Sequence, residues 1–78
     1  MKPRPKATIE EQSPDEILWK IVWPPSHDNM GSTYYAAENT QTSVLRILTA
    51  DYRLPAASGV IERLTPAIQK AIGRAKLR

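Results

Sequence analysis

The segment from residue 16 to residue 23, EILWKIVW, alternates between two faces in the way that is typical of a β-strand. The apolar positions on one face are Ile17, Trp19, Ile21 and Trp23. Two consecutive prolines follow and end the segment, because proline has no backbone N–H to donate. We therefore predict a strand over residues 16–23.

A helix over the same residues remains an alternative. Ser13, Pro14 and Glu16 have the order of a capping box with proline at the first helical position. The apolar residues that follow would also share one face of a helix. We favour the strand, because a helix of about ten residues that carries two tryptophans would be apolar nearly all round.

The next residues predict a hairpin. Residues 25–31 bring together proline, aspartate, asparagine and glycine, the residue types that favour turns. We predict a second strand over residues 33–38, in which Tyr34 and Tyr35 point to opposite faces.

The second half of the chain predicts two helices and a third strand. We predict a helix over 41–53, as cover for one face of the sheet. Its apolar residues at helical spacing are Val44, Leu45, Ile47, Leu48 and Tyr52. Thr65 and Pro66 resemble the start of a helix, so a second helix is predicted over 66–76 and a strand over 59–64. A helix over 59–64 that breaks at the proline is the alternative.

These elements give a small single α+β domain over residues 14–78, with about three antiparallel strands covered by two helices in the order β-β-α-β-α. Residues 1–13 contain two prolines and a single large apolar residue, Ile9. We expect them to form a flexible basic arm. A helix-turn-helix within YYAAENTQTSVLRIL is disfavoured, because the segment lacks a turn glycine.

The amino-acid composition limits which metal sites and catalytic groups the chain can form. The chain has 78 residues, no cysteine, one histidine and three glycines. His27 beside Asp28 lacks the partners of a transition-metal site, and no nucleophile, base and orienting group can be nominated together. We expect no metal, no cofactor and no enzymatic activity. We find no signal peptide or membrane span, and expect a cytoplasmic protein without a membrane partner.

Charge is segregated along the chain. All eight acidic residues lie within 7–62, whereas residues 1–6 and 66–78 carry only positive charges. Those of the last segment are Lys70, Arg74, Lys76 and Arg78. They form a positive stripe that could attract phosphates or a protein partner, and cations also suit the C-terminal end of a helix. Lys2, Arg4 and Lys6 could assist.

The chain has five aromatic residues and no phenylalanine. They are Trp19, Trp23, Tyr34, Tyr35 and Tyr52. Most are expected in the core, but Trp23 beside the prolines and one of the two adjacent tyrosines are candidates for an interface. The candidate binding residues are therefore Arg63, Lys70, Arg74, Lys76, Arg78, Trp23 and Tyr34.

The run TYYAAENTQTSVLRIL, a tyrosine-bearing strand followed by a polar cap and an amphipathic segment, resembles a pattern in small phage-borne inhibitors of host machinery. Anti-CRISPR proteins and inhibitors of host RNA polymerase are among them. The resemblance implies a non-enzymatic protein that blocks a bacterial protein or nucleoprotein complex by occupying its surface, with a homodimer as a further expectation. The alternative is a small DNA- or RNA-binding accessory protein that uses the basic C-terminal helix.

Overall fold

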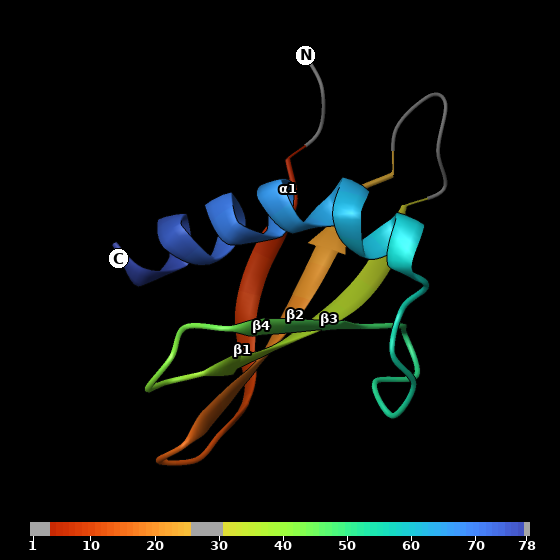
Figure 1. The fold of residues 1–78 in the computed structure, drawn as a ribbon. Helices are drawn as coiled ribbons and strands as arrows, with labels where there is room; N and C mark the ends of the chain where they lie inside the picture. The colour runs from red at the N-terminus through yellow and green to blue at the C-terminus, as the bar shows by residue number, and fades with distance from the viewer. Residues whose placement is uncertain (1–3, 26–30, 78) are drawn as a thin grey trace.

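The computed structural model describes residues 4–25 and 31–77, and every structural statement below refers to these residues. The strands are β1 (Lys6–Gln12), β2 (Glu16–Trp23), β3 (Ser32–Asn39) and β4 (Leu45–Leu48), and the helix is α1 (Ser58–Lys76). The strands form one antiparallel sheet in the order β1-β2-β3-β4. Figure 1 shows α1 lying across one face of this sheet. The prediction of a small α+β domain is thus confirmed, whereas its three strands and two helices are four strands and one helix.

The two central strands follow the sequence prediction closely. Strand β2 has the predicted bounds, and β3 extends the predicted 33–38 by one residue at each end. They pair in continuous register from Glu16 opposite Asn39 to Trp23 opposite Ser32. The tip of the predicted hairpin turn lies in residues 26–30, outside the described residues.

The main core lies between α1 and the sheet. Alternate residues of each strand point toward the helix, because side chains in a strand change face at every step. The buried residues of this core are Ala7, Trp19, Ile21, Ala36, Ile47, Ala56, Ile68, Ala71 and Ile72. Ile21 from β2, Ala36 from β3 and Ile68 from α1 are fully shielded from water, and the two isoleucines are the largest of the fully buried side chains.

The opposite face of the sheet carries a smaller apolar cluster. Leu18, Ala37 and Leu48 are buried there, and Tyr35 packs against them. The Tyr35 ring meets that of Tyr52 edge to face, with centroids 5.0 Å apart. Tyr34 and Tyr35 therefore serve opposite faces, as predicted.

The predicted strand over 59–64 is wrong, because these residues form the first part of α1. The helix continues through Pro66, the predicted first residue of the last helix. A proline within a helix removes one backbone hydrogen bond. The Thr65 hydroxyl donates to the carbonyl oxygen of Ile61 at 2.5 Å, a bond that turns the side chain back onto the helix beside the proline.

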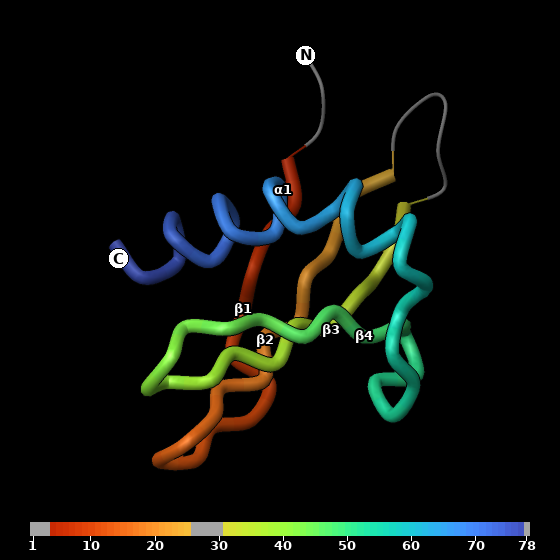
Figure 2. The backbone as a smooth tube through the Cα atoms, in the orientation of Figure 1, coloured from red at the N-terminus to blue at the C-terminus, as the bar shows by residue number. Residues whose placement is uncertain are grey.

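The predicted helix over 41–53 is also wrong, because the segment contains a turn and the short strand β4. The side-chain oxygen of Asn39 accepts the backbone N–H groups of Gln41 and Thr42 at 2.9 and 3.0 Å. Ser43 adopts a φ of 64°, which reverses the chain. These hydrogen bonds favour a hairpin over a helix, because the Asn39 side chain and the two backbone N–H groups bond to each other within a turn. Figure 2 follows the chain from β4 through a loop into α1.

The predicted arm over 1–13 is wrong from Lys6 onward, because Lys6–Gln12 forms edge strand β1. Its register shifts between Ile9 and Glu11, where the strand bulges. Ser13 and Glu16, the capping-box pair, close the turn into β2 instead of starting a helix: the Glu16 N–H donates to Ser13 Oγ at 3.2 Å, and the Ser13 N–H donates to the Glu16 carbonyl at 2.8 Å.

Within the part of the chain that the structure describes, no helix has both the length and the apolar character needed to cross a membrane.

Candidate binding site

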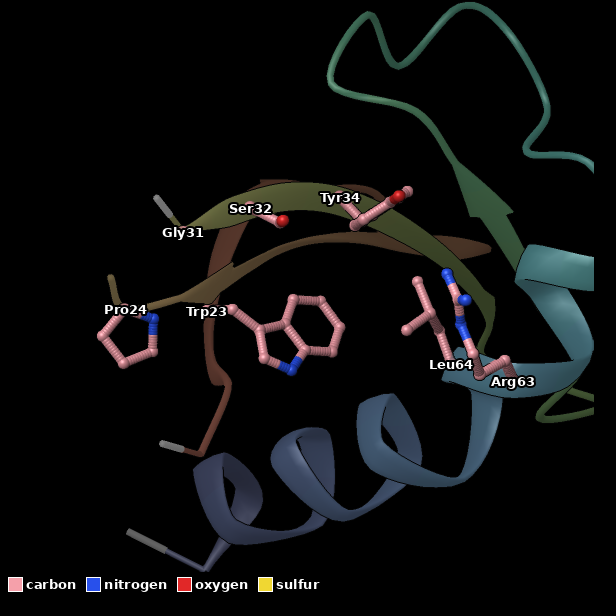
Figure 3. A pocket seen from close by; sticks show the side chains of 7 residues that line it. All are labelled: Trp23, Pro24, Gly31, Ser32, Tyr34, Arg63 and Leu64. Atoms are coloured by element: carbon pink, nitrogen blue, oxygen red, sulfur yellow. The ribbon is translucent and has the colours of Figure 1, made fainter. Parts of the chain in front are cut away.

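Three of the residues nominated from the sequence lie around one pocket. Trp23, Tyr34 and Arg63 line a cavity of about 160 Å³ at the edge of the interface between sheet and helix. The remaining lining residues are Pro24, Gly31, Ser32 and Leu64. Figure 3 shows the Trp23 indole between the ring of Pro24 and the side chains of Leu64 and Arg63, with Tyr34 on the neighbouring strand. We call this set the aromatic pocket.

The sheet register explains why the two aromatic rings meet. Ile21 lies opposite Tyr34 and Trp23 opposite Ser32, so Trp23 and Tyr34 are diagonal neighbours on the face that carries α1. Their ring centroids are 5.9 Å apart and the ring planes make an angle of 86°, an edge-to-face arrangement. Such a pair is favourable beyond the burial of its surface, and it holds both rings in place.

The close approach of the chain at the ends of β2 and β3 depends on Gly31. Its φ is 91°, a conformation that side chains disfavour. A Cβ atom at this position would lie 3.0 Å from the backbone oxygen of Trp23. Glycine therefore allows the two strand ends to meet beside the pocket.

The pocket presents hydrogen-bond donors. Within the described residues, the indole N–H of Trp23, the hydroxyl of Tyr34 and the guanidinium of Arg63 form no hydrogen bond, and no buried side-chain polar atom lacks a partner. A ligand that enters the pocket and contacts these donor groups would have to offer acceptors to them.

The basic stripe predicted on the C-terminal helix is largely engaged within the protein. Arg74 Nη2 donates to the carbonyl oxygen of Pro5 at 2.9 Å. Lys76 Nζ lies 2.7 Å from Glu38 Oε2 in an ion pair. Lys70 is exposed, and Arg78 lies outside the described residues. The stripe therefore does not act as four equivalent cations.

Sequence reasoning missed Glu38, a buried charged residue of β3 that lies beside the C-terminal end of α1. Its side chain lies on the helix-covered face of β3 and the residue is 7% exposed. The indole N–H of Trp19 donates to Glu38 Oε1 at 3.0 Å, and Lys76 binds the second oxygen. Burial acts to raise the pKa of Glu38, but the hydrogen bonds from Lys76 and Trp19 and the charge of Lys76 outweigh it, so the pKa is lowered. Its place in the β3 alternation with Tyr34 and Ala36 was the available signal.

The described residues contain no group of three or more histidine, cysteine, aspartate or glutamate side chains that could hold a metal ion. His27 and Asp28, the only adjacent histidine and aspartate of the sequence, lie outside the described residues.

Comparisons of the chain with models of protein families, with curated proteins and with solved structures find no match.

Proposed function

We propose that this chain is a non-enzymatic binding protein that acts by occupying the surface of a larger bacterial protein or nucleoprotein complex. The observation that carries the proposal is the meeting of Trp23, Tyr34 and Arg63 in one open pocket. Tryptophan, tyrosine and arginine are the residue types that most often dominate the energy of protein interfaces.

The form of the pocket also suits a protein partner. The two rings are held rigidly by their edge-to-face contact, so binding would cost little side-chain entropy. The pocket is too small to enclose a large cofactor, but it can receive one side chain of a partner. Arg63 at its rim would favour a partner segment that carries an acidic or carbonyl acceptor.

In the setting that the sequence resemblance implies, the protein would be an anti-CRISPR-type inhibitor carried by a phage and active in the cytoplasm of the host. Covering a contact surface is a mode of inhibition that needs no catalytic group. A homodimer that pairs the edges of the sheet remains a further prediction.

A comparison of two matched double variants tests the proposal. Tyr34→Ala with Arg63→Ala removes two walls of the aromatic pocket. Tyr52→Ala with Arg53→Ala removes the same residue types elsewhere, and Tyr52 also belongs to an edge-to-face pair. Each variant and the unchanged protein would be used as bait in bacterial lysate, with and without nuclease, and captured proteins quantified by mass spectrometry.

We expect a specific partner to be lost with the pocket variant and retained with the control variant. Retention by both variants, or equal loss from both, would show that the aromatic pocket is not the contact surface. Turnover of a substrate by the purified protein would contradict the non-enzymatic part of the proposal.

A further inference from the structure

The two basic ends of the sequence meet on one side of the fold. Arg4 and Lys6 come from the start of the described chain, and Arg74 comes from the last turns of α1. All three line a cleft of about 230 Å³. Its other lining residues are Pro5, Ala7, Ala71 and Ala75. We call it the basic cleft.

The packing of β1 against α1 brings these residues together. Ala7 is buried in the same core cluster as Ala71, so the start of β1 lies against the C-terminal half of the helix. The hydrogen bond from Arg74 Nη2 to the Pro5 carbonyl, at 2.9 Å, fixes this contact. Figure 2 shows the beginning of β1 passing close to α1. Small side chains line the contact, which leaves room for a ligand between the two elements.

The charge of the basic cleft is unbalanced. No aspartate or glutamate is among its lining residues. A cation near the C-terminal end of a helix is favourable for the helix itself, which offers a structural reason for Arg74. That reason does not apply to Arg4 and Lys6, because they belong to another element. Lys70, exposed on α1 one turn before Arg74, adds a further cation on the same side.

We propose that the basic cleft binds backbone phosphates of a nucleic acid. Arginine matches phosphate well, because its planar guanidinium can donate two parallel hydrogen bonds. Arg74 is already oriented by Pro5 and keeps further N–H groups for a ligand.

The lining residues distinguish this partner from a protein. The basic cleft contains no aromatic and no large aliphatic side chain, only alanine and proline beside its cations. A protein interface usually needs such an anchor, whereas affinity for a nucleic acid backbone comes mainly from charge. The aromatic pocket, in contrast, is lined by two aromatic rings, a leucine and a single cation. The two sites are separate, and the phosphate proposal does not depend on the proposed protein partner.

Fluorescence anisotropy with a labelled 20-base-pair DNA duplex tests the proposal, because phosphate contacts make affinity depend on salt. If three cations neutralise phosphates, the logarithm of the association constant falls with the logarithm of the salt concentration with a slope of about −2.7. Affinity should therefore drop about 40-fold between roughly 50 and 200 mM NaCl.

Two double variants with the same change in net charge locate the contact. Arg4→Gln with Lys6→Gln removes two cations of the basic cleft and should bring the slope to about −1. Lys20→Gln with Arg53→Gln removes two cations that do not line the cleft and should leave the slope unchanged. All four residues lie on strands or loops rather than in the core, and circular dichroism would verify that each variant folds.

Three outcomes would overturn the proposal. They are no binding at the lower salt concentration, an equal loss of affinity in both double variants, and competition by polyglutamate as strong as that by unlabelled duplex. The last result would assign the cleft to an acidic protein segment. Inorganic phosphate alone should compete weakly, because it cannot span several cations at once.

Discussion

Replacing Glu38 with glutamine should destabilise the protein more than replacing any exposed acid. Glutamine keeps the shape of the side chain and can still accept the indole N–H of Trp19. Its NH₂ group, however, would face the ammonium group of Lys76, where the carboxylate now forms a 2.7 Å ion pair. Two donors would then lie against each other in a site that is 7% exposed.

The magnitude follows from the burial of the two partners. A hydrogen bond to a charged group contributes about 1.5 to 3 kcal/mol. The Lys76 side chain is 50% exposed, so solvent screens part of this interaction. We expect Glu38→Gln to lower the free energy of unfolding by about 1.5 to 2 kcal/mol at pH 7, a large part of the stability of a domain this small.

Urea denaturation followed by tryptophan fluorescence measures the loss, and Glu16→Gln provides a matched control. Glu16 also forms an ion pair, with Arg46 at 3.2 Å, but both side chains are substantially exposed. Its replacement should cost at most about 0.5 kcal/mol. Equal losses from the two substitutions would refute the reasoning from burial.

The pH dependence offers a second check. Because the pKa of Glu38 is lowered in the folded protein, the stabilisation from its charged form is present above the ordinary glutamate value of 4.5 and is lost as the pH falls through the folded value. The difference between the unchanged protein and Glu38→Gln should therefore be largest near neutral pH and shrink in acid. A difference that stays constant down to about pH 2 would contradict this assignment.

The remaining predictions concern the core, the strand ends and the helix. Ile68→Ala should lower the free energy of unfolding by about 2 to 4 kcal/mol in urea denaturation, whereas Ile9→Ala, at a residue that is 51% exposed, should cost under about 1 kcal/mol. Gly31→Ala should lower the melting temperature and alter the fluorescence of Trp23, because its Cβ would press on the Trp23 backbone oxygen; an unchanged melting temperature would refute this. Pro66→Ala should stabilise α1 by about 1 to 3 kcal/mol by restoring a backbone hydrogen bond, and a loss of stability in thermal unfolding would show that the proline is needed there.

Strands β2 and β3 could be predicted because their side chains alternate between the two faces of the sheet in a way that the sequence shows. In β2, Trp19 and Ile21 point to the helix while Leu18 and Lys20 point away, so the sequence alternates as the structure does. The two prolines at 24 and 25 then mark the end of the strand. Strand β1 gave no such signal, since as an edge strand it contributes only Ala7 to the buried core.

The predictions for the second half are wrong because apolar spacing and a proline do not by themselves distinguish a helix from a strand. Leu45, Ile47 and Leu48 fit a helix by spacing, but Ile47 is buried on one sheet face and Leu48 on the other. Pro66 resembled a helix start, although Val60 and Leu64 already continue the apolar stripe of α1 toward the N-terminus. Tertiary packing outweighs the local cost of an internal proline.

The site was partly predictable. Trp23 and Tyr34 were nominated as aromatic anchors, and their meeting follows from the hairpin register. The sequence does not predict that Arg63 lies beside them, because the strand predicted over 59–64 is part of α1. The pairing of Lys76 with Glu38 likewise depends on where α1 crosses the sheet, which one sequence does not reveal.

The position of α1 has a consequence for synthesis on the ribosome. Ala7 is synthesised about 60 residues before the helical residues that cover it, Ala71 among them, and this takes roughly 3 to 12 seconds at bacterial or eukaryotic rates. During this interval the nascent strands have no cover for their apolar surface, so aggregation or capture by a chaperone competes with folding. Slowing translation across the codons for α1 should therefore lower the yield of native protein, although the amino-acid sequence is unchanged.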